Sequence, residues 1–125
     1  MYVADTHAWI YYLLDKLPAK SDEIFKSAEH GDIIMFVPTI VICESIYLVE
    51  SAKVKLNFTS LFSKFEKSNN FIVVPLNFGI VKALPNIALR ELHDRIIVAT
   101  AKLLDMPLVT KDKEIVKSDL IKTIW

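Results

Sequence analysis

Cysteine and glycine are scarce in this sequence, which has one cysteine and two glycines among 125 residues. The lone thiol of Cys43 excludes a disulfide framework and a thiolate metal cluster, so we expect a reducing compartment. We interpret Cys43 itself as a small buried side chain. No linker, repeat or low-complexity tract interrupts the chain, and 53% of its residues are hydrophobic. We therefore expect one domain over residues 1–125.

An excess of charge of one sign is also lacking, since fifteen Lys and Arg balance fifteen Asp and Glu. A neutral chain has no global positive field that attracts nucleic acid, but net charge does not report on a local basic rim around an acidic site. The longest apolar run, residues 33–43, contains Pro38 and Thr39 and is shorter than the roughly 20 residues that span a bilayer. Asp5 and His7 stand where a signal peptide needs apolar residues. We expect a cytoplasmic protein without membrane association.

Short apolar runs alternate with helical patterns along the chain. The runs predict five strands, at residues 2–4, 33–37, 71–75, 107–110 and 121–124. The patterns predict helices over residues 6–17, 21–30 with Ser21 as cap, 39–52, 58–67, 77–84 and 93–104, and a helical turn over 111–117. Strands that alternate with helices imply right-handed crossovers. The predicted fold class is α/β: a three-layer α/β/α sandwich with a mostly parallel five-stranded sheet.

Four acidic residues stand at positions that a solvated surface charge does not explain. Asp5 and Asp112 follow the first and fourth predicted strands, whose carboxyl ends meet at one edge of a parallel sheet. Glu44 and Asp94 each lie on a largely apolar helix stripe that faces the predicted core. An unpaired buried carboxylate costs several kcal/mol, so such groups protonate, pair or bind a metal. We therefore expect the four to share one acidic pocket.

Three of these four acids also have a simpler interpretation. Asp5 suits the N-cap of the helix that it precedes, and Asp94 suits a cap or a pair with Arg95. Glu44 suits a buried pair with a lysine or arginine from elsewhere in the chain. Four separate coincidences are less probable than a shared pocket, so the shared pocket is the favoured hypothesis.

A pocket of carboxylates favours particular chemistry. No histidine or cysteine stands in a zinc-ligand spacing, and oxygen ligands suit Mg²⁺ or Mn²⁺, which support phosphoryl chemistry. His7 and His93 lie near candidate acids, but such histidines more often pack or support a site, so we leave both out of the catalytic set. Nearby side chains of Trp9, Tyr11 and Tyr12 suit base stacking or packing. Phosphate contacts are available from Arg90, Arg95, Lys111 and Lys113.

The motifs, taken in order, resemble a known family. Asp5-Thr6-His7, Glu44 followed by Leu48, residues 93–101 and residues 108–112 resemble the PIN-domain ribonucleases, and among them the VapC-type toxins of prokaryotic toxin–antitoxin pairs. The resemblance covers nearly the whole chain. It implies that Asp5, Glu44, Asp94 and Asp112 bind one or two Mg²⁺ or Mn²⁺ ions. It also implies cleavage of single-stranded or loop RNA that leaves a 5′-phosphate and a 3′-hydroxyl.

The same resemblance implies further roles and partners. Thr6 orients the site, and Thr110 is the hydroxyl near the last acid. A homodimer is expected, together with a cognate antitoxin whose C-terminal segment occupies the cleft. Two other functions fit the sequence less well. A receiver-type signalling domain needs an aspartate after the third strand, where this chain has Leu76-Asn77. A non-catalytic PIN-fold scaffold or RNA-binding module has no need of a costly Glu44.

Overall fold

Five parallel strands form the central sheet of the computed structural model, which describes residues 1–125. Their order in the sheet is β3-β2-β1-β4-β5, and every neighbouring pair is parallel. The strands are β1 (Tyr2–Ala4), β2 (Met35–Pro38), β3 (Phe71–Val74), β4 (Leu108–Val109) and β5 (Thr123–Ile124). The predicted parallel five-stranded sheet is therefore confirmed, with strands somewhat shorter than the apolar runs.

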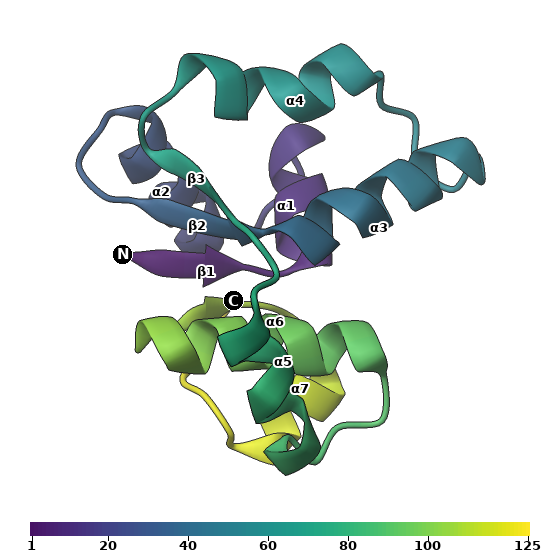
Figure 1. Cartoon of the computed structure of the whole chain (residues 1–125). Coiled ribbons are helices and arrows are strands. Elements are labelled where there is room, and N and C mark those ends of the chain that lie inside the picture. Colours follow the sequence, from purple (N-terminus) through teal and green to yellow (C-terminus); the bar gives the residue numbers. More distant parts are fainter.

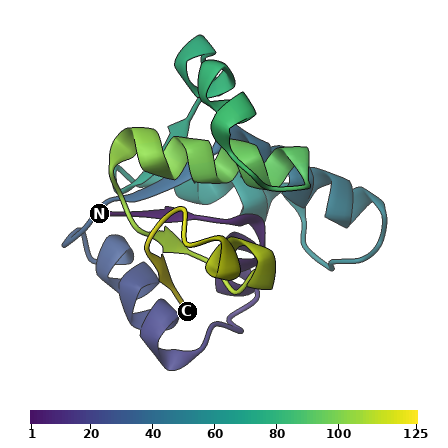
Figure 2. The same cartoon turned by 90° about the horizontal axis from the view of Figure 1, so that it is seen from below.

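Seven helices cover the sheet. They are α1 (Thr6–Leu13), α2 (Ala19–Glu29), α3 (Thr39–Glu50), α4 (Phe58–Lys67), α5 (Phe78–Ala83), α6 (Leu92–Leu104) and α7 (Lys113–Ser118), with a 3-10 turn at Leu84–Asn86. Figure 1 shows α1, α3 and α4 on one side of the sheet and α5, α6 and α7 on the other. Seen from below, α6 runs across the middle strands (Figure 2). None of the helices has the length and apolar character needed to cross a membrane.

The core lies on both faces of this sheet. On the face of α1, the Trp9 ring stacks on Phe65 with centroids 4.8 Å apart, and Tyr12 stacks on Phe25 at 4.6 Å. On the other face, α6 buries Ile97, Val98 and Ala101, as its stripe predicted. Each large apolar side chain buried in this way stabilises the fold by roughly 1.5–3 kcal/mol. The two packed layers therefore hold the strand ends rigidly.

Most helices begin or end within one to four residues of their predicted limits, and the reasons are clear for α1 and α2. The second helix begins at Ala19 after Pro18, so Ser21 is not its cap. Ser21 lies inside the helix, fully buried, and its hydroxyl oxygen has no hydrogen-bond partner. The first helix ends at Leu13 because Asp15 takes a left-handed conformation with φ 56°. Aspartate tolerates the left-handed conformation better than most residues. The helix therefore ends well before Pro18, although its predicted end directly precedes that proline.

The strand order places a topological switch point beside β1. The chain passes from β1 to β2 and β3 on one side, then crosses to β4 and β5 on the other. The connections on the two sides run over opposite faces, so a crevice opens at the carboxyl ends of β1 and β4. This order also excludes the receiver-type alternative, because that fold has the order 2-1-3-4-5.

Left-handed backbone conformations close several of the helices. With only two glycines, the chain places non-glycine residues there: Asp15, Ala52, Asp105 and Asp119. After α3, the Ala52 amide donates to the Val49 carbonyl oxygen and the Lys53 amide to that of Leu48, which is a Schellman motif. Ala52 is the costly case, because its Cβ approaches backbone oxygen without any polar group to compensate.

We predict that Ala52→Gly stabilises the protein by about 0.5–1 kcal/mol. Removal of the Cβ relieves the left-handed strain, which costs roughly 1–2 kcal/mol, and the flexibility of glycine in the unfolded chain cancels part of the gain. Urea unfolding followed by circular dichroism measures the change. Ala88→Gly is the control: this exposed residue has no positive φ, and its substitution should not stabilise. Equal effects of the two substitutions would contradict the prediction.

Candidate active site

Asp5 occupies the end of β1 and is nearly inaccessible, with 3% of its surface exposed. Its Oδ1 accepts a hydrogen bond from the Ala8 amide at 2.7 Å and so caps α1. Its Oδ2 accepts a hydrogen bond from the Thr110 hydroxyl. The capping interpretation is therefore right, and it does not compete with a role in a site. Both bonds hold the carboxylate at the mouth of the switch point.

Thr110 links the ends of β1 and β4. Besides donating to Asp5, its hydroxyl oxygen accepts the Asp112 amide at 3.0 Å. Asp112 in turn caps α7, because its Oδ1 accepts the Ile115 amide at 3.0 Å. Thr110 itself is fully buried. One buried hydroxyl thus fixes the spacing between the two strand-end acids.

Glu44 reaches the same place from α3. The Thr6 hydroxyl donates to Glu44 Oε1 at 2.6 Å, which ties α3 to the first residue of α1. The expectation that Glu44 faces the core is wrong in part: 25% of its side chain is exposed, and Tyr47 on the same stripe is 66% exposed. No lysine or arginine pairs with it. The stripe faces a cavity instead of packed side chains.

Asp94 lies in the first turn of α6, with 13% of its side chain exposed. It is not the cap of this helix, since Glu91 stands at the N-cap without a side-chain bond. It forms no ion pair with Arg95, whose guanidinium donates to the Arg90 carbonyl oxygen at 3.4 Å. Its ionic neighbour is His93, whose Nε2 lies 3.5 Å from Asp94 Oδ1 and 3.4 Å from Glu44 Oε2. Both simpler interpretations of Asp94 are therefore wrong.

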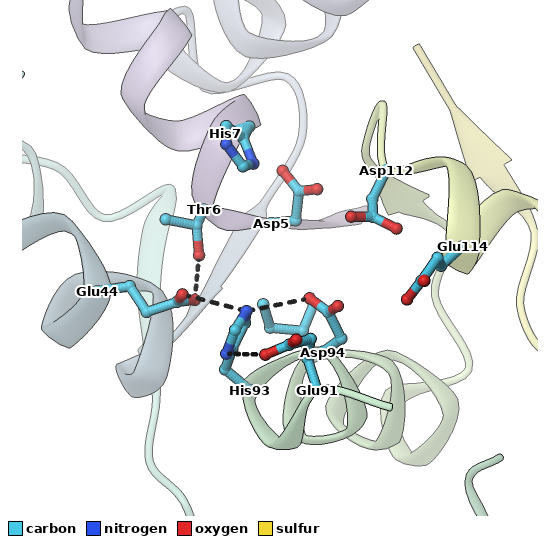
Figure 3. A pocket seen from close by; sticks show the side chains of 10 residues that line it. Asp5, Thr6, His7, Glu44, Glu91, His93, Asp94, Asp112 and Glu114 are labelled. Carbon is cyan, nitrogen blue, oxygen red and sulfur yellow. Dashed lines mark hydrogen bonds and ion pairs between the residues drawn. The ribbon is translucent and has the colours of Figure 1, made fainter. Parts of the chain in front are cut away.

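These four acids line one cavity of about 290 Å³. Figure 3 shows their side chains arranged around a common space, with β1 and α1 on one side and α6 opposite. Ten residues line it, six of them acids and none a lysine or arginine: Asp5, Thr6, His7, Glu44, Glu91, His93, Asp94, Ile97, Asp112 and Glu114. The structure therefore brings the four central acids, Asp5, Glu44, Asp94 and Asp112, to one cavity, as expected from their positions in the sequence.

Sequence reasoning missed two acids of this cavity and undervalued a histidine. Glu91 stands one helical turn before Asp94, and Glu114 stands two residues after Asp112, in the first turn of α7. Their nearness to expected site residues was the available signal. His93 bridges Glu44 and Asp94, which only the packing of α3 against α6 reveals. Cys43, expected to be buried, is exposed beside Glu44.

The crowding of carboxylates changes their proton affinities. The pKa of Asp94 is raised from 3.8 to about 6, mainly by burial and also by the charges of Asp112, Glu44 and Asp5, whereas His93 opposes the rise. Burial also raises the pKa of Asp5, against the hydrogen bonds from Thr110 and Ala8. A site in which negative charge is this costly gains most from a positively charged ligand.

We predict that Asp94→Asn stabilises the protein in the presence of a chelator above about pH 7. Because the folded-state pKa is raised, the ionised Asp94 costs nothing below pH 4, and its cost grows until the pH passes about 6. Removal of the charge should then gain on the order of 1–3 kcal/mol. Thermal unfolding across this pH range tests it. The exposed Asp32→Asn serves as control, and a pH-independent gain would refute the explanation.

Comparisons with known proteins agree with this geometry. The PIN domain family model matches residues 2–119. The crystal structure of VapBC2 from Rickettsia felis bound to a promoter DNA fragment contains a chain with a TM-score of 0.73 at 15% identity, covering 99% of this chain and 98% of that one. The crystal structure of FitAcB from Neisseria gonorrhoeae has a chain with a TM-score of 0.68 at 18% identity, and the match covers 100% of this chain and 97% of that one. A toxin–antitoxin complex from Klebsiella pneumoniae has a chain with a TM-score of 0.66 at 19% identity, and the match again covers 100% of this chain and 97% of that one.

No curated protein sequence matches the chain. At identities below 25%, the likenesses to solved structures show the fold alone. The family model stands on the sequence itself and covers nearly the whole chain, including all four strand-end and helix acids. The sequence pattern, the switch-point geometry and the family model thus agree, and the chain belongs to the PIN domain family, a family of nucleases.

Proposed function

We propose that this protein is a metal-dependent endoribonuclease that cleaves single-stranded or loop RNA. The observation that carries the proposal is the cavity at the switch point, where six carboxylates converge without any lysine or arginine. The pKa values of Asp5 and Asp94 are raised, which means that holding these carboxylates ionised in the cavity costs free energy. A non-catalytic scaffold has no use for this arrangement, because it destabilises the folded chain.

The residues fit a hard divalent cation. Carboxylate oxygens are the ligands that Mg²⁺ and Mn²⁺ prefer, and Mg²⁺ usually takes one or two of them together with water. No three His, Cys, Asp or Glu side chains are already arranged to hold one ion. Asp5, Glu44, Asp94 and Asp112 are the residues that would hold it.

In the proposed phosphodiester hydrolysis, different side chains have different roles. Water attacks the scissile phosphorus in line, the ribose 3′-oxygen leaves, and the 5′-phosphate stays on the other product. A bound cation supplies Lewis-acid activation of the water and of the phosphate oxygens. Asp5 is held in one orientation by the Ala8 amide and the Thr110 hydroxyl, and Thr6 orients Glu44. One of the four carboxylates accepts the proton that the attacking water loses, and all four lie around the same cavity.

We predict that Asp5→Asn and Asp94→Asn each lower RNA cleavage about a hundredfold or more, because each removes charge that holds a cation worth several kcal/mol in the transition state. Cleavage of a panel of RNAs with Mn²⁺, compared with EDTA, measures the loss. Circular dichroism checks the fold, and Asp32→Asn is the charge-matched control outside the cavity. If the folded variants cleave RNA as fast as the wild type, Asp5 and Asp94 do not belong to the active site. If the wild type keeps its activity in EDTA, cleavage does not depend on a metal.

We further propose that the protein is the toxin of a toxin–antitoxin pair in the cytoplasm and forms a homodimer. Support for the pairing comes from the similar folds in the VapBC2, FitAcB and Klebsiella pneumoniae complexes. Support for a dimer comes from α5, where Phe78 and Val81 lie one helical turn apart and are 75% and 43% exposed. Apolar side chains gathered on one helix face favour an interface.

The dimer proposal predicts that Phe78→Ser shifts the protein from dimer to monomer, since it removes the largest exposed apolar side chain of α5. Sedimentation velocity at several concentrations measures the state. Val116→Ser, at another exposed apolar residue, is the control and should leave the dimer intact. A monomeric wild type would refute the dimer. A short reading frame beside the gene whose product blocks cleavage is the test of the toxin assignment.

A further inference from the structure

A second and larger cavity adjoins the acidic one. It measures about 530 Å³ and lies between α1 and the turn that follows α3. His7 lines both cavities, so the two meet at that side chain. The second cavity has an apolar floor made by Ile10, Leu14, Leu48 and Val54. We call it the basic groove, because of the charges that surround this floor.

The charges of the two cavities are opposite. Lys16, Lys53 and Lys55 line the basic groove, and no acid lines it. The acidic cavity has six carboxylates and no lysine or arginine. In a chain whose formal net charge is zero, this separation leaves a local positive surface directly beside the candidate active site. Such a surface attracts anions locally even where the whole protein does not.

The fold fixes the places of two of these lysines. Lys16 follows the left-handed Asp15, and its amide donates to the Tyr11 carbonyl oxygen at 2.8 Å. Lys53 follows the left-handed Ala52, and its amide donates to the Leu48 carbonyl oxygen at 3.0 Å. Each lysine therefore closes a Schellman motif at the end of α1 or α3. Their backbones are held in place, and both residues are exposed.

Tyr11 adds an aromatic side chain to the groove and brings a fourth cation near it. The Lys111 ammonium lies 4.1 Å from the centre of the Tyr11 ring and donates to the Tyr11 hydroxyl. The Tyr11 ring also meets His7 edge-on, with centroids 6.4 Å apart. Positive charge beside an aromatic ring on an apolar floor is the combination that binds single-stranded nucleic acid: cations contact phosphates, and flat or apolar surfaces contact bases and sugars.

We propose that the basic groove binds the segment of single-stranded RNA that flanks the scissile phosphate, with Lys16, Lys53 and Lys55 contacting its phosphates. The strand passes His7 into the acidic cavity. This inference rests on the proposed ribonuclease function and names the path of its substrate. An acidic polypeptide is the competing occupant. RNA is favoured because the groove leads directly to the site proposed to cleave it, and because its apolar floor suits bases.

The test is RNA binding by a groove variant, Lys16→Gln/Lys53→Gln/Lys55→Gln. Fluorescence anisotropy with a labelled single strand of about 12 nucleotides in EDTA measures affinity without cleavage. The control, Lys20→Gln/Lys82→Gln/Lys122→Gln, removes the same charge from exposed lysines outside both cavities. We expect the groove variant to bind at least about tenfold more weakly and its salt slope to fall by about 2, or roughly 0.7 per lost phosphate contact. The control should change much less.

The outcomes separate this inference from the proposed function. If wild-type protein cleaves RNA in Mn²⁺ and the groove variant binds RNA no more weakly than the control, the groove path is refuted while the nuclease stands. If wild-type protein neither binds nor cleaves RNA, the proposed function fails. An oligoglutamate of equal charge represents an acidic polypeptide. Loss of oligoglutamate binding alone in the groove variant would assign the groove to a protein partner and overturn the inference.

Discussion

The hydrogen bond from the Thr110 hydroxyl to Asp5 is the contact on which the site depends. It joins the ends of β1 and β4, the two strands between which the chain changes direction across the sheet. The same hydroxyl oxygen accepts the Asp112 amide. One buried side chain therefore sets the distance between two acids that are more than a hundred residues apart in sequence. The packed layers on either face keep the strand ends, and with them this contact, in place.

Helix capping and site formation use the same carboxylates here. Asp5 caps α1 and Asp112 caps α7, so the helices that cover the sheet begin at the residues that line the cavity. A cap normally offsets the charge of its carboxylate with backbone amides. For Asp5 these bonds do not outweigh burial, and its pKa stays raised. The fold thus tolerates a strained electrostatic arrangement whose cost a divalent cation would remove.

Charge is separated at short range in a molecule that is neutral as a whole. The acidic cavity and the basic groove meet at His7. Net charge alone therefore does not describe the surface of this chain near the cavity. Global steering needs net charge, whereas a strand held along a groove needs only a few cations near the site. Two of the groove's three lysines, Lys16 and Lys53, belong to the turns that end α1 and α3, which are exposed positions where charge costs little.

The sequence by itself determined the class of fold and the four central acids, because apolar periodicity and strand-end position are local properties. Alternating runs were enough to predict the parallel sheet, and Asp5 and Asp112 followed from it. Tertiary structure alone decided the rest. Glu44 faces a cavity, and His93 bridges it to Asp94, because α3 and α6 approach each other across the switch point. Glu91 and Glu114 had only the weak signal of lying close in sequence to Asp94 and Asp112. The basic groove became visible only in the tertiary structure, since through-space proximity between distant segments leaves no periodic trace along the chain.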